Sequence, residues 1–207
     1  MSDPKLAASG LTGVEVHGMT RSAFILRGAL AAGSVYGAAT IGPFVGQALA
    51  MSGGDVDVVN FALTLEYLEA DFYKKAQALG LSGTAMKLAK EFGDAESQHV
   101  DALTQTVKKL GGAPAKKPTF QFPIKDEQSF LMLAQTLEDT GVSAYNGAAP
   151  QIQSKEVLGA AGSIVQVEAR HAAAIRLQRS QPPAPAAFDK TLQKPEVLKA
   201  VKPLIKA

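Results

Sequence analysis

The sequence contains no cysteine and no tryptophan, and only three histidines. The absence of cysteine excludes disulfide bonds, thiolate metal sites, iron–sulfur clusters and cysteine nucleophiles. Neither charge sign predominates, because 21 basic residues stand against 19 acidic ones, and this balance gives no support to nucleic acid as a partner. Only 6% of the residues are aromatic, whereas 46% are hydrophobic. With 207 residues, the chain is long enough for one domain with a core and additional segments.

Although histidine is scarce, two of the three histidines follow a glutamate at the same spacing. Glu96 precedes His99 by three residues, and Glu168 precedes His171 by three residues. The two Glu-x-x-His elements are 72 residues apart. A single Glu-x-x-His element is usually a solvated glutamate beside a surface or core histidine. Two such elements in the same register of a repeat indicate a common binding site.

Two Glu–Tyr pairs have the same offset. Glu66 with Tyr73 and Glu138 with Tyr145 differ by 72 in both members. The chain therefore contains one unit twice: a glutamate, a tyrosine seven residues later, and Glu-x-x-His thirty residues after that glutamate.

The repeated unit supplies four carboxylates and two imidazoles, which form a set of ligands for two metal ions. A step of three residues places Glu and His on neighbouring tracks of one helix face, so that both can hold one ion. Oxygen and nitrogen ligands without thiolate suit iron or manganese, although zinc is compatible with them. The predicted metal ligands are Glu66, Glu96, His99, Glu138, Glu168 and His171.

The pattern of apolar residues predicts four long helices, at about residues 56–79, 82–110, 126–150 and 154–179. Asp55 is a candidate N-cap for the first of them, and the spacing places Leu110 and Leu158 on inward faces. Residues 111–125 are long enough to cross the bundle, with two aromatic side chains that attach this connection to the core. The fold class is therefore all-α: a four-helix bundle with a long crossover between the second and third helices.

The composition divides the chain into three parts. Residues 1–50 form a disordered start and an export or anchor segment, residues 51–180 form the bundle, and residues 181–207 form a Pro-rich link with a C-terminal strap. His17 lies in the first part, outside both repeats, and is interpreted as a solvated bystander.

The segment from Arg21 to Ala50 has a basic start, an uncharged middle rich in Ala and Gly, and an end of small residues. Its start resembles the twin-arginine export signal, with Ser22 in place of the second arginine. We therefore expect export to a periplasmic or extracellular location. Two alternatives remain open: cleavage after Ala50, or retention of residues 21–50 as a membrane anchor.

The stretch 56–73, VDVVNFALTLEYLEADFY, together with the two Glu-x-x-His elements, resembles the ferritin-like superfamily. The resemblance is to its bacterial branch of exported ferritin-like domains, some called desiccation-related proteins, and covers about residues 55–178. It implies a ferritin-like four-helix bundle with a dinuclear iron centre that is oxidised by oxygen or peroxide. The signal segment and the Pro-rich tail distinguish the chain from the cage-forming ferritins.

The resemblance and the repeat together assign a role to each ligand. Glu66 and Glu138 each hold one ion terminally, and His99 and His171 each complete one site. The remaining pair, Glu96 and Glu168, bridges the two ions. Glu69 is a rival to Glu66, but it lacks a counterpart because Gly141 stands 72 residues later.

Tyr73 and Tyr145 have two interpretations at this stage. They either donate hydrogen bonds to the metal-binding carboxylates or simply fill the bundle as buried aromatic residues.

The expected function is that of a dimetal protein with two Fe ions, or Mn in their place. It would oxidise ferrous iron with oxygen or peroxide and protect an extracytoplasmic space from oxidative stress. The alternative is a non-catalytic ferritin-like scaffold, used in stress- or desiccation-related binding without functional metal. Association into a homo-oligomer is left open.

Overall fold

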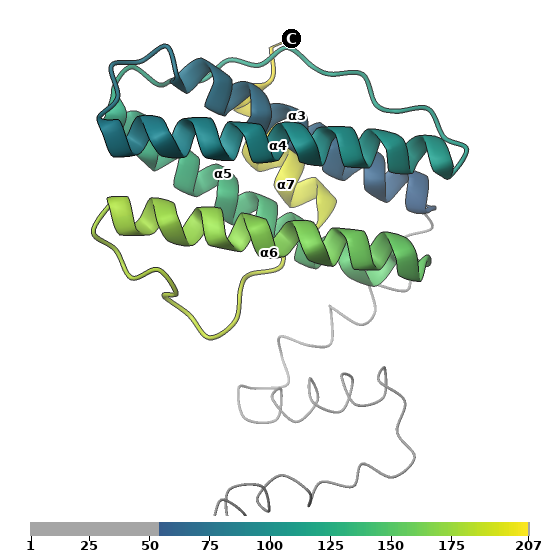
Figure 1. Ribbon diagram of the computed structural model, residues 1–207. Coiled ribbons are helices and arrows are strands. Elements are labelled where there is room, and N and C mark those ends of the chain that lie inside the picture. Colours follow the sequence, from purple (N-terminus) through teal and green to yellow (C-terminus); the bar gives the residue numbers. More distant parts are fainter. Residues whose placement is uncertain (1–53, 207) are drawn as a thin grey trace, which may run out of the picture. The chain divides into compact units, whose positions relative to one another are not determined.

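The computed structural model describes residues 54–206, which form a bundle of helices (Figure 1). The four long helices are α3 (Asp55–Ala76), α4 (Gly83–Lys109), α5 (Glu127–Ala148) and α6 (Lys155–Gln178). A short helix, α7 (Lys194–Val201), lies near the C-terminus, and single 3-10 turns follow α5 (η2, Ala149–Gln151) and α7 (η3, Lys202–Leu204). The prediction of an all-α four-helix bundle is confirmed.

The predicted export or anchor segment, residues 21–50, lies outside the described residues, as does His17. Among the helices of residues 54–206, none is long and apolar enough to cross a lipid bilayer. The division of the chain at residues 50 and 180 stays a prediction.

Side chains at the first residue before each helix fix the starts of α4, α5 and α6. Ser82, Asp126 and Ser154 each accept a hydrogen bond from the backbone N–H three residues later. These bonds satisfy donors that have no partner within the helix.

Asp55 behaves differently from the prediction, because Gly54 and not Asp55 is the N-cap of α3. The Asp55 carboxylate instead accepts hydrogen bonds from the backbone N–H groups of Gln153 and Ser154, both at 2.8 Å. The prediction that Asp55 caps α3 is therefore wrong, because local sequence does not show that its carboxylate binds the backbone just before α6. In the structure, Asp55 joins the start of α3 to the start of α6.

The connection between α4 and α5 runs along the whole bundle (Figure 1). An extended chain covers about 3.3 Å per residue, so residues 110–126 can span the roughly 40 Å length of the 27-residue helix α4. The backbone N–H of Ser82 donates to the Glu127 carboxylate at 2.5 Å, which places the start of α5 beside the start of α4. Helices α3 and α5 are consequently antiparallel, as are α4 and α6.

Aromatic residues attach this crossover to the bundle, as the sequence suggested. Phe120 is 1% exposed, and the ring of Phe122 packs edge-on against Phe72 with centroids 5.3 Å apart. The Lys75 ammonium donates to the Phe120 carbonyl at 2.8 Å. The crossover meets the chain just after η3 in a β-bridge between Phe120 and Ile205.

The C-terminal strap packs into the same core as the bundle. Val197, Val201 and Leu204 are buried and belong to the main hydrophobic cluster. Upstream of α7, the chain passes so close to α5 that a Cβ atom on Gly147 would lie 2.0 Å from the Leu192 carbonyl oxygen. A glycine is therefore required where the strap meets α5.

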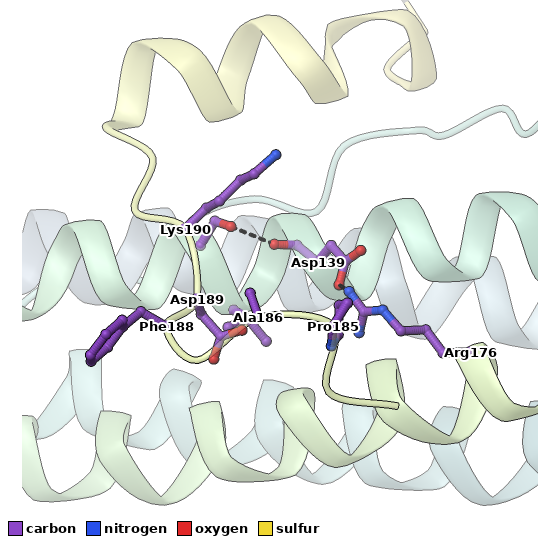
Figure 2. Close-up of a pocket in the computed structure, with 9 residues that line it drawn as sticks. Asp139, Arg176, Pro185, Ala186, Phe188, Asp189 and Lys190 are labelled. Atoms are coloured by element: carbon purple, nitrogen blue, oxygen red, sulfur yellow. Dashed lines mark hydrogen bonds and ion pairs between the residues drawn. The ribbon is translucent and has the colours of Figure 1, made fainter. Parts of the chain in front are cut away.

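Residues 179–193 link α6 to the strap and cover a hollow beside α5 and α6 (Figure 2). An ion pair between Asp139 of α5 and Arg176 of α6 forms one wall. Phe188, at the outer edge, is 78% exposed.

The four helices are not equally buried. Helices α3 and α5 have twelve buried residues each, whereas α4 has seven and α6 has six. The inward faces of α4 and α6 are narrower than predicted: Leu110 is 37% and Leu158 is 42% exposed. In α4, Leu103 and Val107 occupy the inward face instead.

Candidate metal centre

The six predicted ligands come together in the middle of the bundle. Each lone glutamate comes from an inner helix, α3 or α5, and each Glu-x-x-His pair from an outer helix, α4 or α6. The four carboxylates have an exposed fraction of 0%, and the side chains of His99 and His171 are 12% and 7% exposed. The three-residue spacing makes each Glu–His pair face the same way, as the helix period requires.

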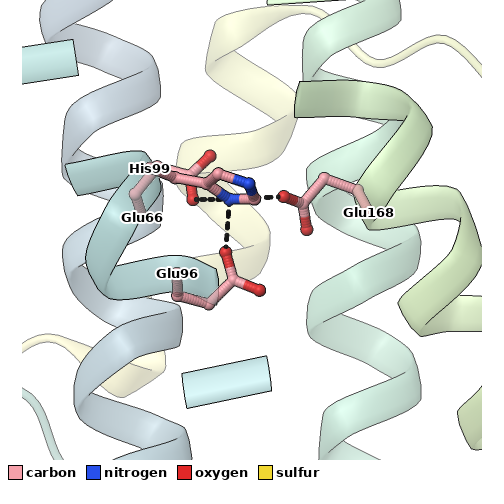
Figure 3. A group of neighbouring side chains, drawn as sticks. All are labelled: Glu66, Glu96, His99 and Glu168. Atoms are coloured by element: carbon pink, nitrogen blue, oxygen red, sulfur yellow. Dashed lines mark hydrogen bonds and ion pairs between the residues drawn. The ribbon is translucent and has the colours of Figure 1, made fainter. Parts of the chain in front are cut away.

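One group of ligands surrounds His99 (Figure 3). Its Nδ1 atom lies 2.9 Å from Glu96 Oε2, 3.1 Å from Glu168 Oε1 and 3.2 Å from Glu66 Oε2. The four side chains of this group come from three helices: Glu66 from α3, Glu96 and His99 from α4, and Glu168 from α6.

A second group surrounds His171. Its Nδ1 atom lies 2.9 Å from Glu96 Oε1, 3.5 Å from Glu138 Oε2 and 3.9 Å from Glu168 Oε2. In both groups, one ligand atom from each of the four residues lies within 4.8 Å of the others.

The two groups share Glu96 and Glu168. Each of these carboxylates directs one oxygen toward His99 and the other toward His171. Glu66 contacts only the first histidine and Glu138 only the second. The arrangement is therefore two adjacent sets of oxygen and nitrogen donors with two carboxylates in common, and the role of these residues as ligands stays a prediction.

The two tyrosines of the repeat cross the bundle. Tyr73 of α3 donates a hydrogen bond to Glu138 Oε1 of α5, and Tyr145 of α5 donates to Glu66 Oε1 of α3 at 2.5 Å. Each bond engages one oxygen and leaves the other facing a histidine. Both tyrosines are also buried, so each one donates a hydrogen bond to a carboxylate and also fills the core of the bundle.

Burial and mutual repulsion strongly perturb the acid–base behaviour of the centre. Burial, followed by the charge of neighbouring glutamates, raises the pKa of Glu66 well above its ordinary value. Burial lowers the pKa of the histidines, but hydrogen bonds to carboxylates outweigh it and raise the pKa of His99 to about 12 and that of His171 to about 10. For Glu96, burial raises the pKa, but hydrogen bonds from both histidines lower it to about 2. Positive charge in the centre therefore stabilises its carboxylates.

Several buried polar atoms of the centre lie close to a histidine or a carboxylate but form no hydrogen bond of good geometry within residues 54–206. Leaving a buried polar group without a partner costs about 2–7 kcal/mol, depending on the reference state. A pair of cations at the centre would give these atoms partners, so the residues present fit two metal ions. The atoms are Glu96 Oε1, Glu138 Oε2, both carboxylate oxygens of Glu168, and His171 Nδ1.

Aromatic rings enclose one side of the centre. Phe92 of α4 stacks on the His171 imidazole with centroids 3.9 Å apart and planes at 19°. The same ring packs edge-on against Tyr73 at 5.7 Å. These contacts restrict the orientation of His171 and keep water away from its face.

A fifth buried glutamate lies next to the six predicted ligands. Glu69, one turn after Glu66 on α3, is 3% exposed. The repeat did not predict Glu69 as a ligand, because Gly141 stands at the equivalent position of the second unit. Its three-residue distance from Glu66 on a buried helix face was the signal that could have retained it.

Comparisons with known proteins agree with this architecture. A crystal structure of a conserved hypothetical protein from Mycobacterium tuberculosis matches with a TM-score of 0.57 and 18% identity, over 65% of this chain and 96% of that chain. This likeness concerns the fold alone. No curated protein matches the chain. The family model of the ferritin-like domain matches residues 54–181, and the chain therefore belongs to the ferritin-like domain family.

Proposed function

We propose that the chain binds two metal ions, iron or manganese, at the Glu/His centre. This proposal rests on the orientation of the Glu96 and Glu168 carboxylates. Each of them directs one oxygen toward His99 and the other oxygen toward His171. The first ion would be held by Glu66 and His99 and the second by Glu138 and His171, with the shared carboxylates between them.

The proposed activity is the oxidation of ferrous iron by oxygen or peroxide, as protection against oxidative stress. When bound, an iron pair supplies the one-electron chemistry that no side chain offers. The chain itself holds the carboxylates in place through the crossed hydrogen bonds of Tyr73 and Tyr145. Phe92 and the buried bundle exclude water from the histidines.

The alternative is a non-catalytic scaffold without functional metal. It is favoured by the close pairing of His99 with three carboxylates, because a protonated histidine compensates part of their charge without any ion. In that case the bundle would be stable without metal, and its function would lie in stress- or desiccation-related binding.

Metal content separates the two functions. After anaerobic loading with Fe(II) and removal of excess metal, elemental analysis should give about two ions per chain, as a two-metal site requires. A parallel loading with Mn(II) shows which ion is preferred. The matched variants are Glu96→Gln, which changes the centre, and Gln98→Ala, which changes an exposed position on the same helix. Glu96→Gln should lose metal while Gln98→Ala retains it, and a value near zero for the unaltered chain favours the scaffold.

The activity has its own test. Addition of oxygen or peroxide to the Fe(II)-loaded protein should produce the ultraviolet absorbance of ferric iron faster than in a protein-free control. Two bound ions without faster oxidation would leave the metal site in place and contradict the oxidase.

We further propose that the chain is exported, as in the exported, desiccation-related branch of ferritin-like proteins. The support is the basic start, apolar middle and small-residue end of residues 21–50. N-terminal sequencing of protein from its native source is the test. A start at Met51 indicates cleavage, an intact N-terminus in the membrane fraction indicates an anchor, and an intact N-terminus in the cytosol contradicts export.

A further inference from the structure

The internal repeat breaks one turn after its first ligand. Thr64-Leu65-Glu66 matches Thr136-Leu137-Glu138, but three residues later Glu69 of α3 corresponds to Gly141 of α5. The break lies on the buried face of both helices, because Glu69 and Gly141 are both buried. The two halves of the centre are thus different at this one position.

Glu69 has no partner that explains its burial. It is 3% exposed, and within residues 54–206 its carboxylate forms no hydrogen bond or ion pair. Besides burial, the groups that disfavour ionisation of Glu69 are other carboxylates, first Glu168 and then Glu138. An unpaired carboxylate in such a place is unfavourable unless it is protonated or binds a cation.

Gly141 provides the space that Glu69 occupies. A Cβ atom at Gly141 would lie 3.2 Å from Glu69 Oε1 and 3.8 Å from Glu69 Oε2. It would also lie 3.9 Å from Glu168 Oε2, the oxygen that faces His171. The carboxylate of Glu69 is therefore placed on the side of the centre that contains Glu138 and His171.

A glycine in the middle of α5 has a cost of its own. Glycine in a helix interior is less favourable than alanine by about 1 kcal/mol. At Gly141 this cost coincides with a buried carboxylate directed at the same place. The glycine at position 141 is accounted for if its missing side chain leaves the space that the Glu69 carboxylate needs.

We infer that Glu69 is a seventh metal-binding residue, which would add one further carboxylate to the ion that Glu138 and His171 would hold. The inference rests on the proposed binding of two ions. It makes the two positions unequal: the ion beside His99 has no such additional ligand, because Gly141 has no side chain. Binding of the two ions should consequently occur in two steps of different affinity.

Two substitutions test this from opposite helices. Glu69→Gln retains the size of the side chain and removes its charge. Gly141→Ala retains Glu69 but places a methyl group against its carboxylate. The matched controls are Glu91→Gln, at an exposed glutamate of α4, and Gly162→Ala, at a helical glycine with nothing within 4 Å of an added Cβ.

The probe is Co(II), whose visible absorption reports its number of ligands. Anaerobic titration in competition with a chelator gives the affinity of each step. The unaltered protein should bind two Co(II) ions in distinguishable steps. Glu69→Gln and Gly141→Ala should each weaken one step about tenfold or more and change its absorption, since even the loss of a residue that only supports a metal ligand typically costs about 10–100-fold. Both controls should match the unaltered protein.

The position of Glu69 is tested in the histidine variants. In a His99→Ala background, the remaining ion is the one beside His171, and Glu69→Gln should weaken it further. In a His171→Ala background, the remaining ion is beside His99, and Glu69→Gln should leave its affinity unchanged. The reverse result would place Glu69 at the other ion and overturn the assignment.

A purely structural Glu69 predicts something else. Its replacement would then lower the melting temperature of the metal-free protein and leave both Co(II) steps intact. We expect the opposite, a melting temperature that is unchanged or higher, because Glu69→Gln replaces a buried carboxyl group that is surrounded by other carboxylates and has no partner.

The outcomes separate this inference from the proposed function. If the unaltered protein binds two Co(II) ions and Glu69→Gln binds them equally well, Glu69 is not a ligand, while the proposed function stands. If the unaltered protein binds no Co(II), Fe(II) or Mn(II), the proposed function and this inference fail together. If Glu69→Gln does not fold, circular dichroism detects this, and Gly141→Ala, which retains the carboxylate, decides the question in its place.

Discussion

The two helical hairpins, α3–α4 and α5–α6, contribute the same ligands but have different surroundings. The offset of 72 residues relates Phe72 to Ala144 and Phe92 to Ile164, so these two phenylalanine rings have no aromatic counterpart in the second hairpin. Phe92 stacks on the histidine of the other hairpin, His171.

The outer coverings of the two hairpins differ as well. Lys75 of α3 reaches the crossover by donating to a carbonyl group. Its counterpart in α5 is Gly147, which lets the C-terminal strap approach closely. The difference shows which residues a dinuclear site constrains: ligands must converge on fixed points and are repeated, whereas packing residues need only fill the volume together and can differ.

The largest effect should come from a carboxylate that serves both hairpins. Glu96→Gln removes a contact from both ions, whereas Glu66→Gln removes one from a single ion. Because an ion at 100 times its Kd adds about 2.7 kcal/mol, Glu96→Gln should abolish about 5 kcal/mol of metal-dependent stability and Glu66→Gln about half of that. Denaturant unfolding with and without Mn(II) measures both. Equal losses in the two variants would show that Glu96 is not shared.

The two histidines allow a direct comparison of the hairpins. His99→Ala and His171→Ala should each reduce the metal content from two ions to one and lose about 2.7 kcal/mol of metal-dependent stability. In the metal-free protein, His171→Ala should be the more destabilising by about 1 kcal/mol, because it also loses its stacking on Phe92. Melting temperatures with and without Fe(II) provide the test. A histidine whose loss leaves the metal-induced shift intact is a core residue and not a ligand.

The pH dependence should be similar for both hairpins. The pKa values of His99 and His171, about 12 and about 10, exceed the ordinary 6.5, so their protonation stabilises the metal-free fold fully below pH 6.5. This stabilisation declines progressively above pH 6.5 and is gone once the pH has risen through 10 to 12. The pKa of Glu66 is also raised, so its contribution is lost as the pH rises above 4.5.

Metal ions must displace these protons, so affinity should rise with pH, about tenfold per pH unit for each proton released. From pH 6 to pH 8, the metal-induced rise in melting temperature should therefore grow while the metal-free protein becomes no more stable. Calorimetric titration in buffers of different ionisation enthalpy counts the protons. Binding without proton release would contradict the arrangement of the centre.

Because the C-terminal strap packs closely against α5, a substitution at their contact should destabilise the strap locally. Gly147→Ala places a Cβ atom 2.0 Å from the Leu192 carbonyl oxygen, so the strap must move. We expect a loss of about 1–3 kcal/mol in the free energy of unfolding, the usual cost of overpacking, and faster proteolysis of residues 179–193. Gly159→Ala, with nothing within 4 Å, is the control and should be neutral or slightly stabilising. Unchanged stability of Gly147→Ala would show that the strap does not depend on this contact.

The smallest expected effect concerns the crossed tyrosines. Tyr73→Phe and Tyr145→Phe each remove a hydrogen bond to the terminal glutamate of the opposite hairpin. Each should weaken one ion by about tenfold, or about 1.4 kcal/mol, with the ring still filling the core. Competition titration with Co(II) measures this. If neither variant changes metal affinity, the tyrosines serve the core alone.

Much of the fold follows from the sequence because the relevant signals are local. Each residue turns an α-helix by about 100°, so Glu96 and His99 must share a face whatever surrounds them. The four helices, the crossover and the caps at Ser82, Asp126 and Ser154 were predictable for the same reason. The repeat then showed which six side chains belong together.

Other features depend on which helices become neighbours, and only the tertiary structure decided them. The tyrosines hydrogen-bond across the bundle, the Asp55 carboxylate caps a chain segment about a hundred residues away, and α4 buries Leu103 where the pattern favoured Leu110. A helix period places side chains on a face but does not say what that face meets. Glu69 is the clearest case, since its environment is set by the missing side chain of Gly141 on another helix.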